Sequence, residues 1–162
     1  MKPLFKTVLA LYLLTLLWLV LLKTSLDLSS VLDLQMRSLN LIPFADFSRV
    51  SLRGMIDNLI VFIPLGLLLS VNFKRVSFWR KLAFVFIFSL TAEIIQFVLA
   101  IGVTDITDVV TNTLGGLVGL VLYGFGNKYV DRDKLDRFIV AVITVLLILF
   151  ILFRFLVFRV RY

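Results

Sequence analysis

The chain has 162 residues, 61% of them hydrophobic, with a net charge of +7 and a mean hydropathy of +1.09. Soluble domains are about 45–50% apolar, so this composition predicts an integral membrane protein with one domain, residues 1–162. The absence of cysteine and histidine excludes disulfides, thiolate nucleophiles, haem ligation and the usual zinc and copper sites.

The positive charge has a simple explanation in a chain this apolar. Basic residues at the ends of membrane helices set their orientation and contact anionic lipid headgroups. We therefore expect membrane lipids as partners and no nucleic acid. We also expect no cofactor and no metal site. Only a hard ion such as Mg²⁺, held by oxygen ligands, would fit the composition, and no motif supports one.

Five apolar segments predict an all-α, polytopic helix bundle, with helices at about residues 4–22, 56–71, 82–101, 109–125 and 138–157. The first segment would be roughly 28 Å long at about 1.5 Å per residue. It is longer than the apolar region of a signal peptide, about 7–15 residues, and Lys23 follows it directly. We expect it to be a retained helix.

The second segment is the least regular of the five. Its charge-free run, residues 58–73, is only sixteen residues long, and Pro64 lies inside it. Proline removes a backbone donor and tends to kink a helix, so a kinked, thin or partly re-entrant element is an alternative there to a full span.

Residues 23–55 are expected to form a long outer loop that lies partly in the membrane interface. One short amphipathic helix is predicted within it, supplied by Leu28, Val31, Leu32 and Leu34. A second connection, the turn Gly102–Asp105, is expected between the third and fourth helices.

Basic residues in the connecting segments indicate how the bundle is oriented in the plasma membrane. With the N-terminus inside, ten basic residues are cytoplasmic: Lys2, Lys6, Lys74, Arg75, Arg80, Lys81, Lys128, Arg132, Lys134 and Arg137. Seven are then outside: Lys23, Arg37, Arg49, Arg53, Arg154, Arg159 and Arg161. The positive-inside rule favours this orientation, although the basic C-terminal tail fits it badly.

Polar residues within the apolar segments converge on the outer side in this orientation. A carboxyl group such as that of Glu93 costs about 2.5–3.5 kcal/mol within a membrane helix, so a functional role is its default hypothesis. We predict an outward-facing pocket between the second, third and fourth helices, with the candidate residues Asn58, Glu93, Gln96, Asp105, Asp108 and Asn112. Arg49 and Arg53, just before the second helix, are candidates for binding a headgroup.

Small residues are expected to bring two of these helices close together. Asp108, Asn112, Gly115 and Gly119 are spaced to form one stripe on the fourth helix, and Gly115-x-x-x-Gly119 would let another helix approach. On the second helix, Asn58, Phe62 and Gly66 form a similar stripe, next to Pro64.

Structural roles would explain several of these residues equally well. Asp108 could be the N-cap of the fourth helix, and Asp105 could be a solvated turn residue. Asn112 could join two helices by a hydrogen bond worth about 0.6–2 kcal/mol. Glu93 is the residue that a structural role explains least well.

These motifs, taken in order, resemble the VanZ-like family of small bacterial membrane proteins. The likeness covers residues 40–123 and rests on four stretches: Asn40–Phe44, Asn58–Gly66, Glu93–Gln96 and Asp105–Gly119. It implies a multi-helix protein of the cell envelope, and the namesake is associated with resistance to teicoplanin-type glycopeptides. The family pattern often has an arginine after the glycine that corresponds to Gly102. This chain has none there, so Arg49 or Arg53 would have to replace it.

Four functions remain open from the sequence. The first is an accessory protein that binds or modifies a lipid-linked or cell-wall component in the outer leaflet. The second is a membrane enzyme acting on an isoprenoid phosphate or glycolipid, with carboxylates and Mg²⁺, but the chain lacks an obvious nucleophile and base pair. The third is a small transporter with broken helices, and the fourth is a structural scaffold.

Overall fold

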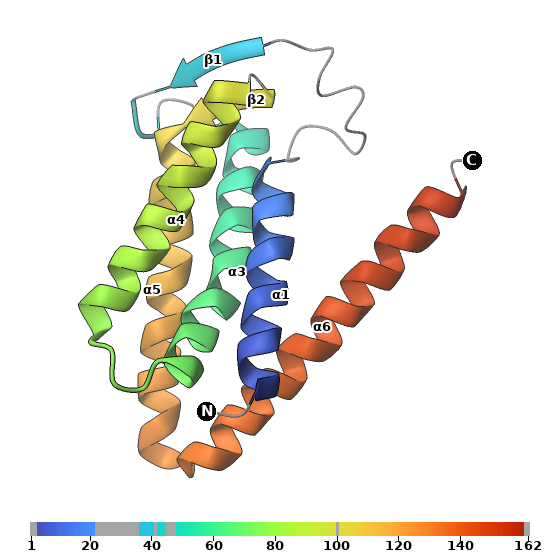
Figure 1. Cartoon of the computed structure of the whole chain (residues 1–162). Helices are drawn as coiled ribbons and strands as arrows, with labels where there is room; N and C mark the ends of the chain where they lie inside the picture. The colour runs from blue at the N-terminus through green and yellow to red at the C-terminus, as the bar shows by residue number, and fades with distance from the viewer. Residues whose placement is uncertain (1–2, 22–35, 41, 45–47, 100, 161–162) are drawn as a thin grey trace.

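The computed structural model describes residues 3–21, 36–40, 42–44, 48–99 and 101–160 (Figure 1). Its helices and strands follow in the order α1 (Pro3–Leu21), β1 (Met36–Asn40), α3 (Arg49–Asn72), α4 (Phe78–Leu99), β2 (Ile101–Asp105), α5 (Ile106–Tyr129) and α6 (Arg132–Val160). All five helices are long and apolar enough to cross a membrane. The predicted polytopic bundle of five helices is confirmed, and its orientation stays a prediction.

The helix α3 is longer than the sequence pattern indicated. It begins at Arg49 rather than near residue 56, because the Ser48 side chain caps it by accepting a hydrogen bond from the Ser51 amide at 3.2 Å. The helix continues through Pro64 and includes a 22-residue apolar segment, Ser51–Asn72. The alternative of a short or thin second span is therefore wrong, and the outer loop ends before residue 49.

Two short strands replace part of the connections that were expected to be irregular. Ile101–Asp105 forms β2 and pairs in parallel with β1, in a register that places Asn40 opposite Asp105. The expected turn at residues 102–105 is wrong, because a partner about sixty residues away in the chain supplies the pairing and no local pattern reveals it. The expected amphipathic helix at residues 28–34 lies outside the described residues.

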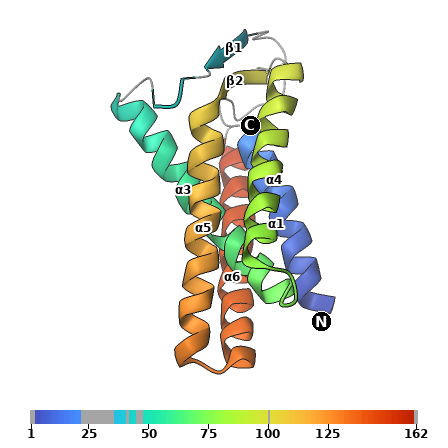
Figure 2. The ribbon, with the colours of Figure 1, turned by 90° about the vertical axis from the view of Figure 1, so that its left-hand side faces the viewer.

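The strands mark one end of the bundle, here called the strand end. The opposite end, where α1 begins, is called the amino-terminal end. Figures 1 and 2 show α1 and α4 running towards the strand end, while α3 and α5 run away from it. The helices α3 and α5 therefore both begin beside the sheet, and α4 ends there.

The closest packing in the bundle joins α3 to α5 through glycines. A Cβ atom added to Gly115 would overlap the Leu59 carbonyl oxygen, and one added to Gly119 would overlap that of Ile63. On the facing helix, a Cβ at Gly66 would overlap the Gly116 carbonyl oxygen. The two backbones are therefore in direct contact, as the small-residue stripes predicted.

The helix α4 packs on the other side of this pair. A Cβ atom added to Gly116 would lie 2.6 Å from Val85 Cγ1, so α4 also approaches α5 closely. The buried face of α4 carries Val85, Ser89, Ala92, Glu93 and Gln96. Its polar members lie towards the strand end, which positions them for the site described below.

The helix α6 leans away from the other four (Figure 1). Among its described side chains the buried apolar ones are Ile139, Val140 and Ile143, in its first half, and Leu147, just past its midpoint. Asp136, only 2% exposed, fixes that half: one carboxylate oxygen pairs with Lys74 Nζ at 2.5 Å and the other accepts a hydrogen bond from the Tyr123 hydroxyl at 2.8 Å. Beyond Leu147, the described side chains of α6 are exposed or half-buried.

The glycine contacts give a first prediction. Gly115→Ala and Gly119→Ala should each destabilise the bundle by about 1–3 kcal/mol or more, because the added methyl group must push α3 and α5 apart. Unfolding of purified protein in mixed micelles would measure the loss. Gly124→Ala is the matched control on the same helix, since nothing lies within 4 Å of its added Cβ. It should be neutral or slightly stabilising, and equal losses in all three variants would contradict the packing described.

The orientation gives a second prediction, which the absence of native cysteine makes simple to test. Ile42→Cys, at an exposed position at the strand end, should react with a membrane-impermeant maleimide in intact cells. Ser77→Cys, in the exposed connection between α3 and α4, should react only after the cells are permeabilised. The reverse pattern would place the N-terminus outside.

Candidate functional site

Polar residues from separate parts of the chain meet at the strand end in two hydrogen-bonded groups, together called the strand-end cluster here: Asn40, Asp105 and Glu93 form one, and Asn58 and Asp108 form the other. Asn40 Nδ2 donates to Asp105 Oδ2 at 3.2 Å, and the Asp105 amide donates to Glu93 Oε2 at 3.1 Å. Asn58 Nδ2 donates to Asp108 Oδ1 at 2.6 Å. Each of the four stretches that carried the family resemblance contributes to this cluster.

Asp105, rather than Asp108, is the N-cap of the fourth membrane helix. The helix α5 begins at Ile106, directly after β2, so Asp105 is its N-cap and its Oδ1 accepts the Thr107 amide at 2.8 Å. Asp108 lies in the first turn. The N-cap role proposed for Asp108 is therefore wrong, and so is the solvated-turn role for Asp105. The shift arises because the strand leads into the helix without a turn.

Three carboxylates, those of Glu93, Asp105 and Asp108, surround the start of α5. The unpaired amides and the dipole at a helix N-terminus favour negative charge, which offsets part of their mutual repulsion. Nearby, the Phe44 amide donates to Thr107 Oγ1 at 3.1 Å, which fixes the Asn40–Phe44 stretch against α5. The result is a group of hydrogen-bond acceptors held in place by backbone contacts.

Two further amides join the helices of the bundle. Asn112, fully buried, donates from Nδ2 to Ser89 Oγ on α4 at 2.8 Å. Gln96 donates from Nε2 to the Val20 carbonyl oxygen near the end of α1 at 2.7 Å. These contacts agree with the expected role of Asn112 in joining two helices. Neither amide oxygen has a hydrogen-bond partner within the described part of the chain.

An apolar cavity of about 230 Å³ lies beside the cluster, between α4, β2 and the start of α5. It is lined by Leu90, Glu93, Ile94, Phe97, Thr104, Asp105, Ile106 and Val109. Glu93 is only 2% exposed and lines this space. Thr104 adds a hydroxyl, which donates to the Glu93 carbonyl oxygen at 3.3 Å.

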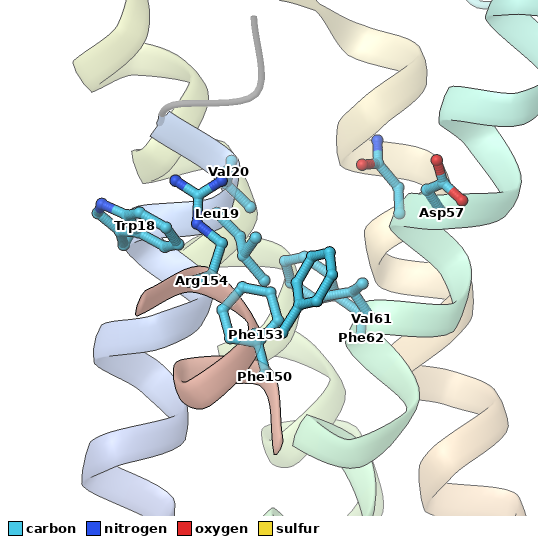
Figure 3. A pocket seen from close by; sticks show the side chains of 10 residues that line it. Trp18, Leu19, Val20, Asp57, Val61, Phe62, Phe150, Phe153 and Arg154 are labelled. Atoms are coloured by element: carbon cyan, nitrogen blue, oxygen red, sulfur yellow. The ribbon is translucent and has the colours of Figure 1, made fainter. Parts of the chain in front are cut away.

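The expected candidates do not share one pocket. Asn58 lines a second space of about 330 Å³ between α1, α3 and α6, which Asp57 and several aromatic side chains also line (Figure 3). The direct contact of α3 with α5 separates the two spaces. Arg53 is exposed near the start of α3, and the side chain of Arg49 lies outside the described residues. No group of three or more acidic side chains is placed to hold a metal ion among the residues described.

Three features of the structure were missed by the sequence analysis. Ser89 could have been found, because it lies four residues before Glu93 and so on the same helix face. Asp136 precedes the predicted fifth helix, residues 138–157, but α6 begins at Arg132 and buries it. The contact of Arg154 with the Trp18 ring, 4.6 Å from guanidinium carbon to ring centroid, left no pattern in the sequence.

The fold and the cluster together define a multi-pass membrane protein with a carboxylate-rich group at one end of its bundle. Residues 9–127 match the VanZ/LLP1 family model. Over 153 residues, 94% of each chain, the sequence is 55% identical to Protein VanZ of Enterococcus faecium. The chain belongs to the VanZ/LLP1 family, which confirms the resemblance seen in its motifs. No solved structure matches it.

The Asn58–Asp108 hydrogen bond gives a third prediction. Because the bond joins α3 to α5 and its acceptor is a carboxylate, a double-mutant cycle of Asn58→Ala and Asp108→Ala should give a coupling energy of about 1–2 kcal/mol. The free energy of unfolding in mixed micelles is the quantity to measure. A cycle of Asn58→Ala with Asp133→Ala, at the other end of the bundle, should be additive. Additivity in the first cycle would contradict the contact.

Proposed function

We propose that this protein binds a lipid-linked or cell-wall component of the envelope at its strand end, and that it thereby alters susceptibility to glycopeptides. In this proposal the strand end faces the outer leaflet of the plasma membrane. The observation that carries it is the buried Glu93 carboxylate, which contacts the Asp105 amide beside an apolar cavity.

The chemistry of the cluster favours a ligand rich in hydroxyl and amine groups. Carboxylates and amide oxygens accept hydrogen bonds, and the sugar and peptide parts of a lipid-linked precursor supply many donors. The adjacent cavity is almost wholly apolar, which suits the hydrocarbon part of such a molecule. Arg53, exposed at the same end, supplies a guanidinium group for its phosphate.

The similarity to Protein VanZ supports the same proposal. The chain covers 94% of Protein VanZ at 55% identity, so the two share the segments that build the cluster. The family resemblance links the namesake to glycopeptide resistance, and the outer surface is where a glycopeptide meets its target. A site that binds an envelope component there would compete with the drug or change what the drug encounters.

The fourth prediction tests this proposal with isosteric variants. Glu93→Gln and Asp108→Asn remove one charge each and keep the shape of the side chain, so both proteins should still insert. Expressed in a susceptible host, wild-type protein should raise the inhibitory concentration of teicoplanin severalfold, and both variants should lose most of that increase.

Asp133→Asn is the matched control. It removes the same charge from an exposed position at the amino-terminal end and should keep the full effect. Immunoblots of the membrane fraction would confirm equal amounts of each protein. Full protection by both Glu93→Gln and Asp108→Asn would refute the proposal.

A further inference from the structure

A groove at the amino-terminal end of the bundle, here called the α4 groove, combines apolar walls with two positive charges. It lies between the first half of α1, the end of α3 and the start of α4, and its volume is about 410 Å³. Ligand sites commonly have volumes of about 300–1,000 Å³. Figures 1 and 2 show these helix ends at the end of the molecule opposite the two strands. The groove therefore shares no residue with the strand-end cluster.

Two adjacent basic residues, Arg80 and Lys81, line the groove. Lys74, in the same stretch of chain, is paired with Asp136, whereas Arg80 and Lys81 form no ion pair or side-chain hydrogen bond with any other described residue. Lys81 is also half-buried. A charge that is partly withdrawn from water and lies beside a like charge is unfavourable until an anion joins it.

The position of these two cations on their helix adds to the imbalance. The helix α4 begins at Phe78, so Arg80 and Lys81 lie within its first four residues, and its first turn contains no acidic residue. The N-terminus of a helix carries a partial positive charge and favours anions over cations. Two cations at that end thus leave a local excess of positive charge, which a bound anion would neutralise.

The charges lie at the rim of the groove, and its apolar walls extend from there towards the middle of the bundle. Phe84 is three residues further along α4 than Lys81, and Leu13 and Leu69 provide the walls on α1 and α3. Trp79, 74% exposed beside Arg80, is of the residue type enriched where a membrane meets water. The groove therefore changes from charged to apolar in the same direction as a membrane leaflet does.

We propose that the α4 groove binds an anionic phospholipid from the leaflet at the amino-terminal end, with its phosphate at Arg80 and Lys81 and one hydrocarbon chain along the apolar walls. Guanidinium and ammonium groups both donate charge-assisted hydrogen bonds to phosphate oxygens. A zwitterionic lipid would bring a further positive group beside the two cations. A free phosphate ion would leave the apolar walls uncovered. The proposal does not depend on the role of Glu93 or on the orientation of the bundle.

A single tryptophan in the groove provides a direct test, because the chain has only two tryptophans, Trp18 and Trp79, and both can be replaced by phenylalanine. In that background Phe84→Trp places the probe in the groove wall. Phe86→Trp is the matched control, since Phe86 lies on the same helix outside the groove, and the two phenylalanines are 42% and 44% exposed.

Fluorescence of the purified proteins in detergent micelles is then measured as lipids with brominated chains are added. Phosphatidylglycerol should quench the Phe84→Trp protein at a severalfold lower mole fraction than phosphatidylethanolamine or phosphatidylcholine, because only the anionic lipid is held at the groove. The Phe86→Trp protein should show no headgroup preference. Quenching by brominated chains also separates a bound lipid from a free phosphate ion.

Charge variants in the Phe84→Trp background assign the phosphate contact. Arg80→Gln and Lys81→Gln should each raise the required mole fraction of phosphatidylglycerol severalfold, and the double variant should abolish the preference. Lys134→Gln and Arg137→Gln make the same changes at exposed positions of α6 at the same end of the bundle, and should keep it. Equal quenching by the three lipids, the same preference at the control probe, or a preference that survives the double variant would overturn the proposal.

Native mass spectrometry provides a second readout that needs no tryptophan probe. From an equal mixture of the three lipids, the unaltered protein should retain phosphatidylglycerol severalfold more often than either zwitterionic lipid. The protein with both Arg80→Gln and Lys81→Gln should lose that selectivity, while the one with both Lys134→Gln and Arg137→Gln should retain it. Equal retention of the three lipids by the unaltered protein would count against the site.

Discussion

The direct contact of the α3 and α5 backbones is the constraint on which the rest of the structure depends. Gly115 and Gly119 lie against carbonyl oxygens of α3, and Gly66 lies against α5, so no side chain separates the helices there. At this distance polar residues nearer the strand end can reach each other, and Asn58 bonds to Asp108. Without the glycines, that hydrogen bond would have to cross a gap the width of a side chain.

The contact between α3 and α5 also separates two spaces whose walls carry different charged residues. On the side of α4, the start of α5 is surrounded by acceptors and faces the cavity that reaches Glu93. On the side of α1 and α6, Asp57 and Arg154 line the second space. The two spaces differ in charge as well as in position, because one collects carboxylates and the other is lined by a carboxylate and a cation. A single helix pair thus borders two spaces with different charged residues in their walls.

The sequence predicted the features that depend on local spacing. Five apolar runs gave five helices, and the Gly115-x-x-x-Gly119 spacing gave the helix contact. It missed β2, which needs a partner far along the chain in β1, and it also missed the local cap at Ser48 that begins α3. The sequence also indicated Asn58, Glu93, Asp105 and Asp108, but the predicted pocket combined them with Gln96 and Asn112. The position of a residue along a helix and on its face does not tell which other helix packs against that face. Asp136 and Arg154 carry no local pattern, since charges near a helix end usually remain exposed.

The buried anchor of α6 at Asp136 has a mechanical consequence. Eighteen residues separate it from Arg154, a helical distance of about 27 Å at about 1.5 Å per residue. A tilt of about 10° at the base would therefore move Arg154 by about 5 Å by lever-arm geometry over that helical length. The helix acts as a lever with its fulcrum at the Lys74–Asp136–Tyr123 contact. On the far arm Arg154 contacts the Trp18 ring of α1, so a tilt of this size would break that contact but no hydrogen bond of the strand-end cluster.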